Sequence, residues 1–114
     1  MSLDRVLKTL QKLSLSRLDA EVYVFLAKRG PHKGLELANA MQITKQQLYP
    51  SLKNLKNKGV ITASRERPAL FSAIAFEKAV NLLVKIKIEQ AETIKETKKE
   101  LLTSWRSINW QEQT

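Results

Sequence analysis

The sequence contains no cysteine, which excludes disulfide bonds and thiolate metal sites and fits a reducing compartment. It has one histidine, and its carboxylates are scattered over predicted helix faces, so no nucleophile–base pair or set of metal ligands can be recognised. We therefore expect neither an enzyme nor a metal or cofactor site. No apolar run approaches the roughly 18–20 residues that a membrane span needs, and no signal peptide stands near Met1. These absences predict a cytoplasmic protein with no membrane partner.

Acidic residues are also scarce, with 11 Asp and Glu against 20 Lys and Arg, a net charge of +9 over 114 residues. The excess is uneven. Residues 1–74 hold 13 basic and 5 acidic residues, a net of +8, whereas residues 75–114 hold 7 and 6, a net of +1. A basic first part joined to a near-neutral second part indicates a polyanion-binding module on a neutral scaffold. Many small proteins are basic for solubility alone, so the charge leaves nucleic-acid binding an open alternative.

Apolar residues at helical spacing predict three helices in the first third of the chain. The first covers residues 2–13. The second opens at Ser16, with Asp19 three residues on, and ends where Lys28 and Arg29 precede Gly30. A third, shorter helix covers about residues 34–41. Together these segments supply enough apolar surface for one small core.

Residues 43–61 carry the start, buried face and end of a further helix. Thr44 and Gln47 have the spacing of a capping box, and Gly59 suits the left-handed position that ends helices. Leucines at i, i+4 and i+7 predict a buried stripe, and the opposite face carries amides and lysines but no carboxylate. Pro50 leaves two alternatives: it bends the helix and re-aims its first turn, or the helix begins near Pro50 itself.

After Gly59 the composition changes to two segments rich in β-forming residues, which flank the charged turn of residues 65–68. This pattern predicts a β-hairpin. Two short helices joined by a tight turn, the second with a basic outer face, form a helix-turn-helix. The order of elements therefore predicts a mainly α fold with a small β-hairpin, a winged helix-turn-helix. We expect this domain to cover residues 1–74, with the N-terminal helix 2–13 included.

Residues 75–114 predict one long helix that follows the winged helix-turn-helix. Apolar residues recur on one stripe, with Gln90 and Thr97 as polar gaps, while the stretch between Lys85 and Glu100 is mostly charged. A polar helix of this length is difficult to account for as a lone appendage, so we expect a homodimer in which two such helices pair. The expected dimer interface consists of Leu83, Ile86, Ile94, Leu101, Trp105 and Ile108.

The candidate contacts to double-stranded DNA lie at three places: the start of the third helix, the helix of about residues 45–57, and the hairpin turn. Gln46 is the candidate for a base edge because an amide can bond adenine twice, whereas lysines and Tyr49 suit phosphates. The alternative at each place is an ordinary solvated surface, and a lone histidine beside a turn, such as His32, is more often solvated than bound to phosphate. The expected contact residues are Lys33, Thr44, Lys45, Gln46, Gln47, Tyr49, Lys53, Arg65 and Arg67.

The sequence resembles the TrmB-like family of archaeal winged-helix transcription regulators over roughly residues 13–75. The resemblance rests on LSLSRLDAEVYVFLAKRGP at residues 13–31, on Glu-Leu-Ala at 36–38, and on residues 47–60 with their Lys-Gly-Val exit. It implies a DNA-binding transcription regulator. Larger members carry a C-terminal sugar-binding domain, for which this sequence has no room, so we expect no small-molecule effector domain. Pro50 departs from the charged or polar residue that the family more often has there.

Two hypotheses of function remain. The first is a homodimeric, sequence-specific DNA-binding transcription regulator, with the helix of residues 45–57 in the major groove and the wing of residues 65–68 at its flank. The second is a winged-helix protein-interaction module within a larger transcription or nucleic-acid assembly. The concentration of positive charge in residues 1–74 favours the first, because a docking module has no need of it.

Overall fold

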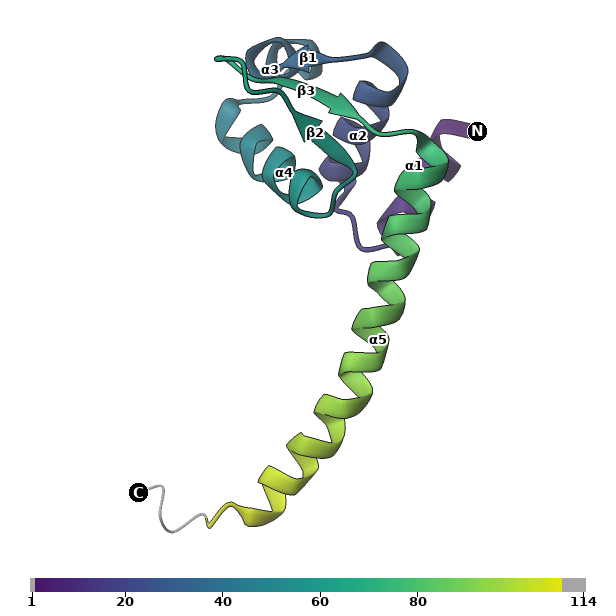
Figure 1. The fold of residues 1–114 in the computed structure, drawn as a ribbon, viewed down its shortest axis with the longest axis vertical. Helices are drawn as coiled ribbons and strands as arrows, with labels where there is room; N and C mark the ends of the chain where they lie inside the picture. Colours follow the sequence, from purple (N-terminus) through teal and green to yellow (C-terminus); the bar gives the residue numbers. More distant parts are fainter. Residues whose placement is uncertain (1, 110–114) are drawn as a thin grey trace. The chain divides into compact units, whose positions relative to one another are not determined.

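The computed structural model describes residues 2–109, so the end of the expected C-terminal segment, residues 110–114, lies outside the described residues. The chain divides into two compact units between Val84 and Lys85. The first unit contains four helices, three short strands and the first turns of a fifth helix (Figure 1). The predicted class, a mainly α fold with a small antiparallel sheet and a long C-terminal helix, is confirmed.

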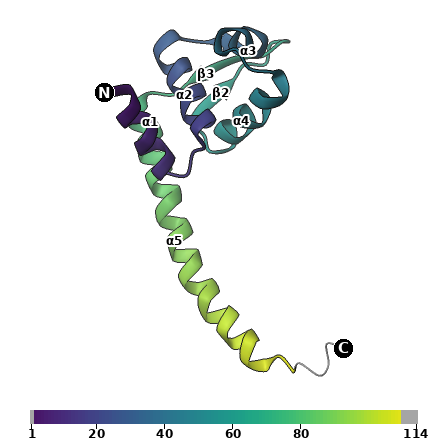
Figure 2. The same ribbon diagram turned by 180° about the vertical axis from the view of Figure 1, so that it is seen from behind.

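The first three helices begin and end close to where local signals predict. Helix α1 covers Ser2–Lys12, α2 covers Arg17–Arg29 and α3 covers Gly34–Met41. At the start of α2, the Asp19 N–H donates to Ser16 Oγ over 3.0 Å, and the Ser16 N–H donates back to the Asp19 carboxylate over 3.3 Å. This reciprocal pair satisfies two N–H groups that a helix start otherwise leaves without partners. Helices α1 and α2 pack against each other (Figure 2).

Helix α4 covers Lys45–Asn57 and continues through Pro50, so the alternative in which it begins near Pro50 is wrong. The predicted capping box is present: the Gln47 N–H donates to Thr44 Oγ1 over 3.1 Å, and the Thr44 N–H donates to Gln47 Oε1 over 2.9 Å. This cap fixes the helix start ahead of the proline. Pro50 itself is exposed, so water can bond the Gln46 carbonyl that loses its helical partner.

The sheet has three strands rather than the predicted two. Strands β2 (Ile61–Ala63) and β3 (Leu70–Ala73) form the expected antiparallel hairpin, and β1 (His32–Lys33) pairs with the other edge of β3. The register places His32 opposite Phe71 and Lys33 opposite Leu70. Strand β1 thereby fixes the start of α3 beside the hairpin. Figure 1 shows α4 running along β2, in agreement with the contacts between these elements.

One apolar core joins the helices of the first unit to strands β2 and β3. Tyr23 of α2 lies in this core, and its hydroxyl donates to the Ile74 carbonyl over 2.7 Å. Burial raises the pKa of the Tyr23 phenol above its ordinary value of 10.0, because the phenolate would lose its hydration. The largest fully buried side chains are Tyr23, Leu10, Leu26, Leu37, Leu48, Leu52, Leu55, Ile61, Leu83, Val22 and Val60.

Helix α5 covers Phe76–Ser107, and its first turns belong to the first unit. Leu83 is only 1% exposed there, packed in the core with Ala79. The expectation that Leu83 forms part of a dimer interface is therefore corrected, because no surface of this side chain is left for a partner. Helix α5 begins two residues after the expected domain boundary at residue 74, and the compact units divide ten residues after that boundary. None of the helices within residues 2–109 has the length and apolarity that a membrane span requires.

A buried carboxylate connects α2 to α4. Asp19 is 5% exposed, and besides capping α2 it accepts a 2.7 Å hydrogen bond from Asn54 Nδ2. We expect Asp19→Ala to lower the free energy of unfolding by about 2–3 kcal/mol, because it removes the cap and leaves the partly buried Asn54 amide without this partner. Urea unfolding of Asp19→Ala, Asn54→Ala and the double variant measures this. Losses that simply add would contradict the coupling between the two side chains.

Candidate nucleic-acid interface

The exposed face of α4 carries polar and cationic side chains and no carboxylate. Its buried residues are Leu48, Ser51, Leu52 and Leu55, which turns the opposite side of the helix to solvent. Successive helical residues are about 100° apart, so Gln46 and Lys53 lie near the middle of the exposed side with Pro50 between them. Lys45 and Tyr49 flank them on one edge, and Tyr49 is 44% exposed. This face can meet an anionic surface without repulsion.

Two of the expected contact residues are already engaged within the helix. The Gln47 Oε1 atom accepts from the backbone N–H of Thr44 and, over 3.2 Å, from its hydroxyl. Both side chains remain exposed, but their oxygen atoms hold the first turn in place. Thr44 and Gln47 therefore position Lys45 and Gln46, whatever else they contact.

Tyr49 connects α4 to the beginning of α3. A Cβ atom added to Gly34 would stand 2.5 Å from the Tyr49 hydroxyl oxygen and 3.0 Å from Cζ, closer than real Cβ contacts come. Only glycine at this first residue of α3 leaves room for the phenol. The tyrosine ring is thus held against α3 rather than extended freely into solvent.

A groove of about 560 Å³ lies between α4 and the hairpin loop. Tyr49 and Lys56 contribute from α4, and Arg65 and Arg67 contribute from the loop between β2 and β3. The hydrogen bonds of Ser64 close the base of this loop: its N–H donates to the Leu70 carbonyl over 2.9 Å, and its hydroxyl accepts from the Leu70 N–H over 2.8 Å. The structure therefore brings three of the residues predicted from sequence, Tyr49, Arg65 and Arg67, to one groove.

Lys56 is a member of this groove that the sequence prediction did not include. Its position in the last turn of α4 suggested only an interaction with the helix dipole. The spacing of seven residues from Tyr49 was the available signal, because residues seven apart share one helix face. Lys58 behaves differently, since its ammonium donates to the Ser14 carbonyl over 3.3 Å.

The predicted site at the start of α3 is only partly available. Lys33 is exposed, but its backbone N–H donates to Glu36 Oε1 over 2.8 Å, which places a carboxylate at this helix end. His32 is engaged by the Gly30 carbonyl 2.7 Å from Nδ1 and by an edge contact with the Phe25 ring. Lys33 alone therefore offers a charge to an anion here.

The cations of the interface are free of carboxylate partners. Asp4 forms ion pairs with Lys8 and Arg17, which lie far in sequence from α4 and the hairpin loop. Lys45, Lys53, Lys56, Arg65 and Arg67 are all exposed. Glu66, between the two arginines, is the one acidic residue lining the groove. The arrangement has the charge that a phosphate backbone requires.

The second unit has exposed apolar side chains on a charged helix. Over residues 85–107 of α5, Ile94, Leu101 and Trp105 are 67%, 66% and 72% exposed, and Ile108 just after the helix is half exposed. Ile86 is partly buried. These are the residues predicted to form a dimer interface, and the structure describes them in a single chain only.

Taken together, a helix-turn-helix made by α3 and α4 and followed by a β-hairpin defines a winged-helix protein. Solved structures with this fold include that of TrmBL2, described as an archaeal chromatin protein, at a TM-score of 0.73 and 23% identity over 92% of this chain and 41% of that one. A transcriptional regulator from Thermotoga maritima, Tm0710, aligns at a TM-score of 0.58 and 17% identity over 95% of this chain and 90% of that one. At these identities the likeness concerns the fold.

Sequence comparison then gives the family. The profile of the family "Sugar-specific transcriptional regulator TrmB" matches residues 10–77, more than half of the chain, and the chain belongs to this family of transcription regulators. A curated relative, the HTH-type sugar sensing transcriptional regulator TrmBL1 of Pyrococcus furiosus, is 26% identical over 109 residues, 96% of this chain. The chain spans about a third of that relative's length, 31%.

Proposed function

We propose that this protein is a homodimeric regulator of transcription that binds double-stranded DNA sequence-specifically in the cytoplasm. Helix α4 enters the major groove, and the hairpin loop of residues 65–68 lies at its flank. Residues 1–74 provide the DNA-binding part and residues 75–114 the dimerisation helix, with the first turns of α5 anchored in the winged-helix core. One observation carries the proposal: the carboxylate-free face of α4 and the arginines of the loop flank one groove.

Within this interface the side chains have different tasks. Gln46, at the middle of the exposed face, reads a base edge, because its amide can pair with adenine in two places. Lys45, Lys53 and Tyr49 hold phosphates, as do Arg65, Arg67 and Lys33. Thr44 and Gln47 fix the helix start from which the others project. The family is one of transcription regulators, which supports a role without catalysis and without a cofactor.

A titration of duplex DNA of random sequence at two salt concentrations tests the proposal. Binding should weaken steeply between about 50 and 200 mM salt, because each phosphate contact releases condensed counterions. No binding at low salt, or binding that salt does not change, contradicts it. Selection of bound sequences from a random pool then tests specificity, which Gln46→Ala should relax and Lys53→Ala should leave unchanged while weakening all sequences.

The protein-interaction module remains the second candidate, because large apolar side chains are exposed on α5. The same titration separates the two functions. A docking module would show no salt-dependent affinity for DNA, whereas its exposed apolar residues would still favour association with another protein.

Gly34→Ala offers a test of how Tyr49 contributes. The added methyl group must push the phenol out of its place, which a flexible exposed side chain can do with little loss of stability. We expect DNA affinity to fall about threefold to tenfold, the range of one displaced polar contact, while the melting temperature changes little. In a Tyr49→Leu background the same substitution should have no further effect on affinity. An equal loss in both backgrounds would show that the position of Tyr49 is irrelevant.

A further inference from the structure

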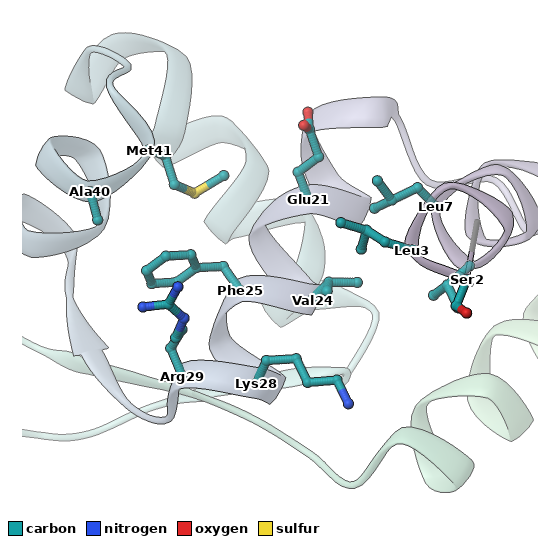
Figure 3. Close-up of a pocket in the computed structure, with 11 residues that line it drawn as sticks. Ser2, Leu3, Leu7, Glu21, Val24, Phe25, Lys28, Arg29, Ala40 and Met41 are labelled. Atoms are coloured by element: carbon teal, nitrogen blue, oxygen red, sulfur yellow. The ribbon is translucent and has the colours of Figure 1, made fainter.

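The first unit contains a second hollow, which the proposed DNA interface does not use. It has a volume of about 720 Å³ and lies among α1, α2 and the end of α3 (Figure 3). This volume is within the range of small-molecule sites, about 300–1,000 Å³. Most of its lining is apolar, from Leu3, Val6, Leu7, Val24, Phe25 and Met41.

The acidic and basic residues that line this hollow lie at opposite ends of it. Glu21 lies at one end, and Lys28 and Arg29 lie about two helical turns away at the end of α2 (Figure 3). In residues 2–109 neither Lys28 nor Arg29 forms an ion pair, and both are exposed at the rim. The guanidinium carbon of Arg29 stands 5.7 Å from the centre of the Phe25 ring, within the range of a cation–π contact (Figure 3). Because no carboxylate of the described residues pairs with Arg29, its N–H donors are available to a bound carboxylate.

We propose that this hollow binds a small organic monocarboxylate with an apolar body. The apolar body would lie against Phe25, Val24 and Met41, and the carboxylate would meet the Arg29 guanidinium beside Phe25. The Lys28 side chain extends away from that guanidinium, so it adds positive charge at the rim and no direct contact (Figure 3). Binding of a sugar is disfavoured, because the lining has too few polar groups to replace the hydrogen bonds that sugar hydroxyls make with water. The two cations also offset the negative end of the α2 dipole, which would otherwise oppose an anion.

The position of the site relates it to the helix-turn-helix. Met41 is the last residue of α3, Gln42 turns the chain in the left-handed conformation at φ 57°, and Thr44 caps α4. A ligand against Met41 therefore touches the segment that precedes the exposed helix. The binding site itself does not depend on the proposed DNA function, and its test uses no DNA.

The test uses 4-phenylbutyrate as the probe and 4-phenyl-1-butanol as its uncharged analogue. The full chain is labelled at the methionine methyl groups, and the Met41 resonance reports on the hollow. We expect saturable shifts with 4-phenylbutyrate at a dissociation constant on the order of 1 mM or tighter, and at least about tenfold weaker binding of the alcohol. Sodium sulfate at equal ionic strength should leave the Met41 resonance unchanged.

Variants separate the apolar and charged parts of the site. Lys28→Gln with Arg29→Gln should weaken binding of 4-phenylbutyrate about tenfold and leave that of the alcohol within about twofold. Lys78→Gln with Lys95→Gln removes the same charge elsewhere and should change neither. Ala40→Phe fills the hollow and should abolish binding of both compounds, whereas Ala27→Phe, on the exposed surface of α2 outside this lining, should not. Circular dichroism confirms that each variant is folded.

Three results would overturn the proposal. One is the absence of any Met41 shift up to about 5 mM probe, a concentration that would half-saturate even a very weak site. Another is equal binding of acid and alcohol, unaffected by removing the two cations. The third is that the wild-type protein does not bind the probe while Ala40→Phe changes the oligomeric state. That result would make the hollow a surface between copies of the chain.

Discussion

Reversing the charge of Lys45 and Lys53 together should reduce affinity for duplex DNA at least about 100-fold at 0.1 M salt, because two phosphate contacts become two repulsions. Both side chains are exposed on a face of α4 that has no carboxylate. The slope of log affinity against log salt should become shallower by about two units, close to the loss of two contacts. Fluorescence anisotropy with a labelled duplex at several salt concentrations measures both quantities.

The matched control is Lys95→Glu with Lys99→Glu, which changes the net charge equally but on the second unit. This variant should retain affinity within about threefold, because neither side chain belongs to α4 or to the hairpin loop. A comparable loss in both double variants would mean that overall charge alone attracts DNA. The proposed role of α4 would then fail, while the fold would be unaffected.

The second large effect concerns association of two chains. The wild-type protein should sediment with twice its monomer mass at micromolar concentration, and Leu101→Glu with Trp105→Glu should convert it to a monomer. Each of these side chains is about two-thirds exposed or more in the single chain. Two copies would bury these side chains together, which stabilises the pair by roughly 25 cal/mol for each Å² of apolar surface buried. Buried carboxylates would instead oppose pairing. We expect the dissociation constant to rise by more than about 1,000-fold, since the change occurs in both subunits.

Ile88→Glu with Leu102→Glu is the control, because these apolar residues are also exposed on α5 but lie about 100–140° around the helix from Leu101. This variant adds the same charge and should remain a dimer. Analytical ultracentrifugation over a range of concentrations measures all three proteins. A wild-type protein that is monomeric at 100 µM, or equal disruption by both variants, would contradict the proposed interface.

Local chemistry explains why much of this fold could be predicted from the sequence. The capping boxes of Ser16 with Asp19 and of Thr44 with Gln47 each involve residues three apart, so they are visible in a linear chain and present in the structure. Strand β1 was missed because two residues have no periodicity, and only pairing with β3 makes them a strand. The helix start at Lys45 followed from its cap, although Pro50 alone suggested an alternative.

Contacts between distant segments explain what could not be predicted. Helical spacing correctly placed Leu83 on the apolar face of α5, but spacing cannot show whether a partner or the same chain covers that face. The approach of Tyr49 to Gly34 joins residues fifteen positions apart and depends on how α3 and α4 cross. The same is true of the groove that unites Lys56 with the hairpin loop. For the candidate site, most of the residues could therefore be predicted from the sequence, whereas their proximity in space became visible only in the structure.

Helix α5 begins in one compact unit and continues into the other, and we expect this to affect how its backbone exchanges hydrogen with solvent. Its amides near Ala79 and Leu83 are protected by the core, so they open only when the whole first unit unfolds. Beyond Lys85 the helix has solvent around almost every side chain, and an isolated helix of this kind has marginal stability in water. Protection there would come from association. If two chains pair as proposed, one part of a single continuous helix is stabilised by the fold of its own chain and the other part by the concentration of the protein.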